Sequence, residues 1–252
     1  VEQLFALHGN DIAAVIIEPL PANNGLLPQR EGYLQQLLQI AHAHNALVIF
    51  DEVITGFRLA FGGAAEFYDV TPDLVTYGKI IGGGFPVGAF GGRADLMDQV
   101  APVGPVYQAG TLSGNPVAMA AGLAALRKLL RDKPWDTLAR RNAALCRNIQ
   151  AIPANKRHPD EIRLNCVAVA SLFWISVGAA ASGETVVRTQ QQVPPEQKNL
   201  FPALFHGLLD RGHYLSPSAF ESGFLSTGHD NSDLDNFVQA AADTLAQLDG
   251  PE

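Results

Sequence analysis

Short apolar runs alternate with amphipathic stretches along the first part of the chain. Four runs have the length of β-strands: 13–19 (AAVIIEP), 46–52 (ALVIFDE), 73–79 (DLVTYGK) and 87–92 (VGAFGG). Between the first two, residues 30–44 carry apolar side chains at helical spacing: Leu34, Leu37, Leu38 and Ala41. The pattern therefore predicts strands that are connected by helices. Strands that are apolar on both faces and linked in this way are typical of a mostly parallel sheet covered on both sides, an α/β fold.

The second part of the chain begins with helical patterns and then changes in character. Residues 116–130 are rich in Ala and Leu, and a further helix follows from Trp135. Charge density rises at 155–163, beyond which we expect strands near 164–176 and helices near 197–211 and 231–247. We therefore predict a large domain at 1–150 and a smaller α+β domain at 151–252.

Composition narrows the function classes. The formal net charge is −8, and no run of Lys and Arg is longer than two residues, which argues against nucleic-acid or anionic-membrane binding. No apolar run reaches the ~18–20 residues that span a bilayer. Histidines are scattered without a metal-binding motif, so we expect no metal. Cys146 and Cys166 form no CxxC pair, and we expect two ordinary buried thiols in a reducing cytoplasm.

Two ionisable residues stand where consecutive predicted strands end. Asp51 closes the run at 46–52, and Lys79 closes the run at 73–79. Ligands of open parallel sheets bind outside the carboxyl ends of the strands. A lysine and an aspartate there are the minimum set for pyridoxal phosphate (PLP) chemistry, in which the lysine forms a Schiff base and the carboxylate pairs with the pyridine nitrogen. A structural ion pair at the sheet edge is the alternative from spacing alone.

The letters around these two residues resemble the class III, fold-type I aminotransferases, and most closely the members that act as glutamate-1-semialdehyde aminomutases. The similarity is carried by EPLPANNGLLP (18–28), VIFDEVITGFR (48–58), TPDLVTYGKIIGGGFPVGAFGG (71–92), QAGTLSGNP (108–116) and GHYLSPSAFESGFLSTGH (212–229). It covers nearly the whole chain apart from roughly 150–200. The family's N-terminal portion, with its phosphate-binding turn, is not found in this sequence, so we expect an incomplete large domain.

The resemblance implies a role for several residues of this chain. Lys79 would hold PLP and move a proton between substrate carbon atoms, and Asp51 would pair with the pyridinium nitrogen. Val53 would pack on one face of the ring, and Asn23 would reach its phenolic oxygen. Thr111 would donate to the cofactor phosphate across a dimer interface, which makes a homodimer part of the site.

A further acid, Glu221, lies where the aminomutases place a carboxylate near the substrate; the alternative is a surface carboxylate beside a helix. Transaminases that use 2-oxoglutarate tend to place a carboxylate-binding arginine in this region, whereas Arg188 and Arg211 lie outside any such context here. An aminomutase needs no second dicarboxylate, because the amino group moves within one molecule. The resemblance thus implies conversion of glutamate 1-semialdehyde to 5-aminolevulinate, the tetrapyrrole precursor.

Two alternatives remain open. The stretch ASLFW at 170–174 and the residues 179–197 depart from the family pattern around a mobile substrate loop. Such a departure suits a class III aminotransferase with another amino-group donor, including a module of a larger biosynthetic enzyme. The third reading is an inactive remnant that serves as a dimerisation or binding module.

Overall fold

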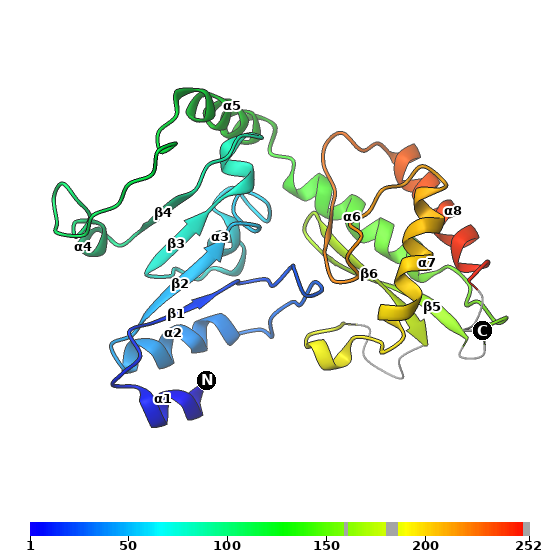
Figure 1. The fold of residues 1–252 in the computed structure, drawn as a ribbon, viewed down its shortest axis with the longest axis horizontal. Helices are drawn as coiled ribbons and strands as arrows, with labels where there is room; N and C mark the ends of the chain where they lie inside the picture. The colour runs from blue at the N-terminus through cyan, green and yellow to red at the C-terminus, as the bar shows by residue number, and fades with distance from the viewer. Residues whose placement is uncertain (159–160, 180–185, 249–252) are drawn as a thin grey trace. The chain divides into compact units, whose positions relative to one another are not determined.

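The computed structural model describes residues 1–158, 161–179 and 186–248. The chain divides into two compact units, each described by itself below (Figure 1). Unit 1 comprises Val1–Leu20 and Gln29–Lys133, and unit 2 comprises Pro21–Pro28 and Pro134–Glu252. Part of the divergent segment at 179–197 lies outside the described residues. No helix in the described ranges is long and apolar enough to cross a membrane.

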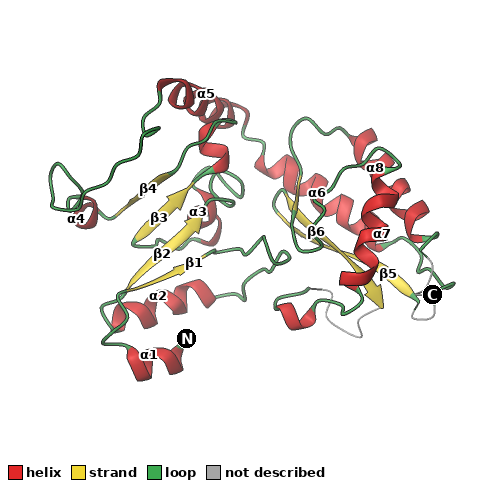
Figure 2. Cartoon of the chain, in the orientation of Figure 1, coloured by secondary structure: helices red, strands yellow, loops and turns green. Residues whose placement is uncertain are grey.

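A four-stranded sheet forms the centre of unit 1. Its order is β1 (Ala14–Ile17), β2 (Leu47–Glu52), β3 (Leu74–Tyr77) and β4 (Ala89–Gly92) (Figure 2). The first three strands are parallel, as the sequence predicts, because α2 (Tyr33–Ala43) and α3 (Gly63–Tyr68) lie in the connections between them. Strand β4 pairs with β3 in the antiparallel direction, so the sheet is mixed. The remaining short helices of unit 1 are α1 (Glu2–His8), α4 (Ala94–Met97) and the 3₁₀ helix η1 (Lys79–Gly82).

One face of this sheet packs on α2. Leu34, Leu37 and Ala41 of the helix are buried with Val48 and Phe50 of β2, which is the apolar face that the helical spacing predicts. Burial of side chains on both faces, expected from the sequence, is not complete in β1. Its residues are alternately exposed and half-buried, and Ile16 is 64% exposed.

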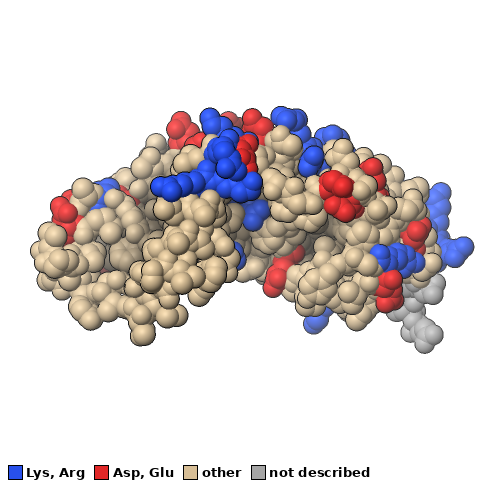
Figure 3. Space-filling view, turned by 90° about the horizontal axis from the view of Figure 1, so that it is seen from above, with Lys and Arg blue, Asp and Glu red and all other residues tan. Residues whose placement is uncertain are grey.

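The end of unit 1 presents apolar side chains to solvent. Helix α5 (Pro116–Asp132) begins at Asn115, whose side chain accepts hydrogen bonds from the N–H groups of Val117 and Ala118. Along this helix only Ala118 and Gly122 are buried. Tyr107 and Leu112, in the loop before it, are 83% and 63% exposed. On the face seen in Figure 3 much of the surface is likewise uncharged, and the charged side chains there carry both signs.

Unit 2 is built on an antiparallel sheet of β5 (Ile162–Val169), β6 (Leu172–Ala179) and β7 (Gly223–Phe224). Its helices are α6 (Trp135–Gln150), α7 (Gln197–Leu209) and α8 (Asn231–Leu245), with a short 3₁₀ helix η2 (Gln190–Gln192). The core joins Leu145 and Ile149 of α6 with Leu204 of α7 and Leu245 of α8. The described elements agree with the α+β pattern predicted for the end of the chain.

Helix α6 belongs to unit 2, whereas the sequence places the boundary after it, between 150 and 151. The division falls at Lys133/Pro134 because α6 packs its apolar face on β5 and contributes Leu138, Leu145 and Ile149 to the core of unit 2. Residues Pro21–Pro28 also belong to unit 2, although they follow β1 directly. Sequence proximity therefore does not determine the unit to which these two segments belong.

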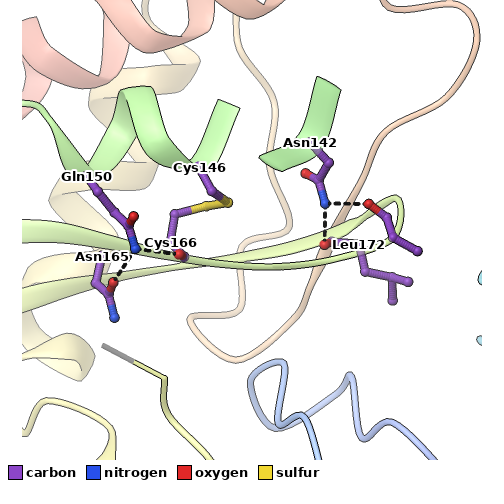
Figure 4. Close-up of a disulfide and its surroundings, with 7 residues drawn as sticks. Asn142, Cys146, Gln150, Asn165, Cys166 and Leu172 are labelled. Carbon is purple, nitrogen blue, oxygen red and sulfur yellow. Dashed lines mark hydrogen bonds between the residues drawn. A yellow bond between two sulfur atoms is a disulfide. The ribbon is translucent and has the colours of Figure 1, made fainter. Parts of the chain in front are cut away.

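Three residues on one face of α6 fasten it to the β5–β6 hairpin (Figure 4). Asn142 donates to the carbonyl oxygens of Ala170 and Leu172, and Gln150 donates to the carbonyl of Cys166. Between them, Cys146 forms a disulfide with Cys166. The sequence-based expectation of two free thiols is therefore wrong. Spacing along the chain does not reveal the pair, because the contact depends on how α6 packs on β5.

Candidate active site

The carboxyl ends of β2 and β3 bring Asp51 beside Thr76. The parallel register places these two residues opposite each other. The Asp51 side chain is half-buried, and its Oδ1 accepts from the Val53 N–H at 3.1 Å and from the Thr76 hydroxyl at 3.4 Å. Within the described ranges, Asp51 Oδ2 accepts no hydrogen bond and Asp51 forms no salt bridge. One carboxylate oxygen is thus held by the protein, and the other remains available to a ligand.

Lys79 begins η1, two residues beyond the end of β3. It has a φ of 49°, in the left-handed region that costs a residue with a Cβ about 1 kcal/mol. Such backbone conformations cluster at functional sites, where the surrounding structure maintains them. Lys79 is exposed, and its amine has no hydrogen-bond or ion-pair partner in the part of the chain that the structure describes. The structural ion pair between Lys79 and Asp51, the alternative from spacing, is not formed.

Val53 contacts both Asp51 and the residue next to Lys79. A Cβ added at Gly78 would lie 3.2 Å from Val53 Cγ1, so the valine packs directly over the residue before Lys79. The Val53 N–H also donates to Asp51, as described above. Three of the predicted site residues therefore gather at neighbouring strand ends of unit 1: a carboxylate, an apolar side chain and an amine.

A second carboxylate, Glu52, is buried on the opposite side of β2. It is fully inaccessible to solvent and accepts from the N–H groups of Ala64 at 2.5 Å and Ala65 at 3.0 Å, and from the Thr55 hydroxyl at 3.0 Å. Burial raises the pKa of the Glu52 carboxyl above its ordinary value, and these hydrogen bonds act in the lowering direction. Burial, followed by the charge of Glu52, also raises the pKa of Tyr77, which lies opposite it in β3.

Asn23 and Glu221 lie on neighbouring segments of unit 2. The Gly25 N–H donates to the Phe220 carbonyl at 2.7 Å, and the Ser222 N–H donates to the Ala22 carbonyl at 3.3 Å. Both side chains are exposed. The structure thus brings together two predicted residues that are almost 200 positions apart in the chain (23 and 221). Their proposed roles toward a ligand remain predictions.

Glu221 borders an open cavity of about 840 Å³ within unit 2, lined also by His213, Ser216 and Phe237. Its Oε2 accepts a hydrogen bond from the Ser216 hydroxyl at 2.6 Å. The carboxylate therefore has a defined orientation while remaining open to solvent. Its surroundings are compatible both with a substrate contact and with the surface role that the sequence leaves open.

Thr111 lies on the exposed loop that precedes α5. No hydrogen bond joins it to another residue of the described ranges. No described hydrogen bond links Thr111 to the cluster at Asp51, and its contact with a cofactor phosphate remains a prediction. In the same ranges, no three His, Cys, Asp or Glu side chains are arranged to hold a metal ion.

Sequence reasoning assigned no role to two residues next to this cluster: Thr76, which contacts Asp51, and Glu52, on the opposite side of β2. The threonine is three positions before Lys79, and only the strand register shows that it faces Asp51. Glu52 is visible in the sequence as the second letter of the DE pair, but its contacts with Ala64 and Ala65 depend on the return of the loop at 53–63. A carboxylate at the end of an otherwise apolar strand was the available signal.

Comparison with known proteins places these observations in a family. The profile of the family described as "Aminotransferase class-III" matches residues 1–171, which is more than half of the chain. This chain belongs to the class-III aminotransferase family. Within that family, it is similar to proteins named glutamate-1-semialdehyde 2,1-aminomutase. It is 46% identical to the one from Akkermansia muciniphila over 248 residues, which are 98% of this chain and 56% of the relative.

A second relative of that name, from Bdellovibrio bacteriovorus, is 48% identical over 241 residues, 96% of this chain and 55% of the relative. This class-III aminotransferase chain therefore spans about half the length of the curated relatives it matches. The resemblance stated from the sequence motifs is confirmed at the level of the family, and the nearest group that it named is found among these relatives.

Solved structures show the same fold. An omega-transaminase from Sphaerobacter thermophilus matches with a TM-score of 0.82 and 33% identity over 97% of this chain and 54% of that one. A β-phenylalanine aminotransferase from Variovorax paradoxus matches with a TM-score of 0.83 and 34% identity, over 96% and 54%. The class-III chain therefore has the α/β fold of fold-type I transaminases, as its motifs predict.

Proposed function

We propose that the protein carrying this chain is a PLP-dependent aminomutase that converts glutamate 1-semialdehyde to 5-aminolevulinate, a step of tetrapyrrole biosynthesis. The names of relatives that are 46–48% identical support this reading. The observation that carries it is the cluster of Asp51, Val53 and Lys79 at adjacent strand ends, where a carboxylate oxygen and an amine have no partner within the described ranges and are available to a ligand.

The residues of the cluster fit the cofactor chemically. When bound, PLP supplies an aldehyde that condenses with amines and a ring that stabilises negative charge on the neighbouring carbon. The exposed Lys79 amine suits the aldehyde, and Asp51 Oδ2 is a free acceptor for a pyridinium N–H. Val53 provides an apolar surface beside Gly78, where a flat ring packs without a polar mismatch. The fit thus rests on the chemistry of these three side chains and on the absence, in the part of the chain that the structure describes, of partners for the Lys79 amine and Asp51 Oδ2.

The residues then have separate tasks in our proposal. Asp51, oriented by Val53 and Thr76, keeps a proton on the ring nitrogen, and Lys79 holds the cofactor and moves a proton between substrate carbon atoms. Thr111 binds the phosphate and Asn23 the phenolic oxygen. Glu221, oriented by Ser216, faces the substrate.

The proposed reaction is tested by supplying glutamate 1-semialdehyde without any keto acid, using the protein expressed with whatever residues its gene encodes before Val1. We expect 5-aminolevulinate to form, because the amino group is returned to the same molecule. Strict dependence on pyruvate or 2-oxoglutarate would exclude the aminomutase and establish a transaminase.

A second candidate function is amino transfer between two substrates. The structural neighbours that are 33–34% identical are named as transaminases, which favours this alternative. An acceptor screen with pyruvate, 2-oxoglutarate and oxaloacetate separates the two reactions, because only the transaminase consumes the acceptor in proportion to product. The module of a larger biosynthetic enzyme is a variant of this candidate.

A homodimer is part of the proposal. The exposed apolar side chains of α5 and of the loop before it, among them Leu112, Val117 and Met119, support burial against a second copy. Sedimentation velocity of the purified protein tests this assignment. We expect a dimer at micromolar concentration, and a concentration-independent monomer would refute it.

We propose a cytoplasmic location from the composition alone.

A further inference from the structure

The loop at 53–63 follows the end of β2, and hydrogen bonds to the buried side chain of Glu52 connect it back to that strand. Glu52 is fully inaccessible, and its Oε2 accepts from both the Thr55 hydroxyl and the Ala64 N–H, while Oε1 accepts from the Ala65 N–H. Thr55 lies at the start of the loop, and Ala64 and Ala65 lie just beyond its end. One carboxylate therefore ties both ends of the loop to the strand.

Glycines make this close return possible. A Cβ on Gly63, which has a φ of 69°, would overlap the Glu52 carboxylate. A Cβ on Gly56 would lie 2.5 Å from Cδ1 of the Tyr77 ring, so the loop also packs closely on β3. The loop thus approaches the sheet on the side that Glu52 and Tyr77 face, and its path leaves no room for the acid to move.

The loop begins with the residue that orients Asp51. Val53 donates its N–H to Asp51 Oδ1 and packs over Gly78, the residue before Lys79. The position of this N–H depends on the path of the loop, because residues 53 and 55 belong to the same short turn; the Gly56 N–H closes that turn on the Glu52 carbonyl. A side chain that fixes the loop therefore fixes one of the two donors to Asp51.

We propose that Glu52 is a positioning residue for Asp51 and Val53, which it orders through the loop at 53–63 without itself contacting the cofactor. This inference rests on the cofactor role proposed above for Asp51. The buried acid offers two acceptor oxygens to three donors, and these offset the cost of removing a charge from water. A glutamine of the same shape has one acceptor oxygen and would direct an NH₂ group at backbone N–H groups. Position 52 thus requires a carboxylate, and an uncharged polar side chain does not replace it.

The test compares Glu52→Gln with a matched control, Glu66→Gln. Glu66 accepts from the Gly62 N–H at 2.6 Å beside the same helix start, but it is exposed, and the described partners of Glu52 do not include it. Hydrogen exchange of the cofactor-free protein is measured first. We expect amides 53–65 to exchange at least about 10-fold faster in Glu52→Gln (about 1.4 kcal/mol of lost local protection). In Glu66→Gln we expect their exchange to be nearly unchanged, except at the Gly62 amide, which donates to Glu66.

The second measurement uses the protein loaded with PLP. We expect Glu52→Gln to weaken PLP binding about 10-fold and to change the pH dependence of the visible absorbance of the bound cofactor. We also expect kcat to fall by a larger factor than the factor by which KM changes. Faster exchange with unaltered PLP affinity, pH profile and kcat would reduce Glu52 to a structural residue and overturn the proposal. Unaltered exchange would overturn it as well.

Two further observations keep the outcomes distinct. If Glu52→Gln does not fold, Thr55→Val is used in its place, because it removes one donor to Glu52 at nearly constant volume. We expect smaller changes in the same direction, and the absence of any change would refute the proposal. If the wild-type protein binds no PLP, the proposed function fails, and the positioning role fails with it. Normal PLP chemistry in both the wild-type protein and Glu52→Gln contradicts the positioning role alone.

Discussion

The two units differ in where they place their polar contacts. Unit 2 fastens its own elements to one another: the side chains of Asn142 and Gln150 and the Cys146–Cys166 disulfide join α6 to the β5–β6 hairpin. Unit 1 instead exposes much of α5, and at the ends of β2 and β3 it has an amine and a carboxylate oxygen with no partner among the residues that the structure describes. Groups without partners inside the chain are the ones that are free to bind something else. We therefore expect substitutions at the ends of β2 and β3 in unit 1 to affect catalysis most, and removal of the disulfide in unit 2 to affect stability.

The largest expected effect is on catalysis, in unit 1. Asp51→Asn keeps the shape of the side chain but removes the charge that, in the proposed function, retains a proton on the ring nitrogen. We expect turnover to fall about 10²–10⁴-fold with little change in melting temperature, and Glu221→Gln in unit 2 to lose less than about 10²-fold. Steady-state kinetics and thermal melts of both variants measure this. A larger loss for Glu221→Gln would reverse the assignment.

The next effect concerns stability in unit 2. The disulfide closes a loop between residues that are 20 positions apart, for which chain entropy predicts a stabilisation of about 3 kcal/mol. We expect reductant to lower the unfolding midpoint of the oxidised protein and to leave the double variant Cys146→Ser, Cys166→Ser unaffected. Denaturant titrations with peptide mapping under non-reducing conditions provide the readout.

The same experiment bears on location. A reducing cytoplasm, which the composition led us to propose, would keep the two cysteines as thiols until the protein is exposed to an oxidant. Because both cysteines are buried, the untreated protein is denatured in the presence of the alkylating reagent, and alkylation of both residues would agree with that location. A midpoint that does not respond to reductant after complete oxidation would contradict the stabilising role of the bond.

The smallest effect is a pH dependence within unit 1. Burial raises the pKa of Asp73, but hydrogen bonds from the Val48 N–H, His42 and Arg93 outweigh it and leave the pKa below its ordinary value. Its stabilisation is therefore complete above the unfolded pKa of about 4 and is lost as the pH falls through the lower folded value.

We accordingly expect Asp73→Asn to cost about 1–2 kcal/mol near neutral pH, since the pair with the half-exposed Arg93 is screened. The difference from wild type should narrow below about pH 4. Urea titrations at several pH values measure the difference. A constant difference across that range would show that the ionised carboxylate is not what stabilises the fold.

The comparison also separates what the sequence predicts from what it does not. Lys79 and Asp51 were predictable because each ends an apolar run, a local pattern, and the family motifs name the same residues. The contact of Thr76 with Asp51, the antiparallel direction of β4 and the pairing of Cys146 with Cys166 were not. Each of these depends on register or packing between segments that are distant in the chain.

The most direct measurement of the central claim is the site at which the cofactor attaches. The protein, expressed with any residues that precede Val1, is loaded with PLP, reduced with borohydride and digested, and the modified peptide is sequenced by mass spectrometry. We predict a phosphopyridoxyl group on Lys79 and no visible cofactor absorbance in Lys79→Ala. Modification of another lysine, or a spectrum that Lys79→Ala leaves unchanged, would contradict the account and favour an inactive binding module.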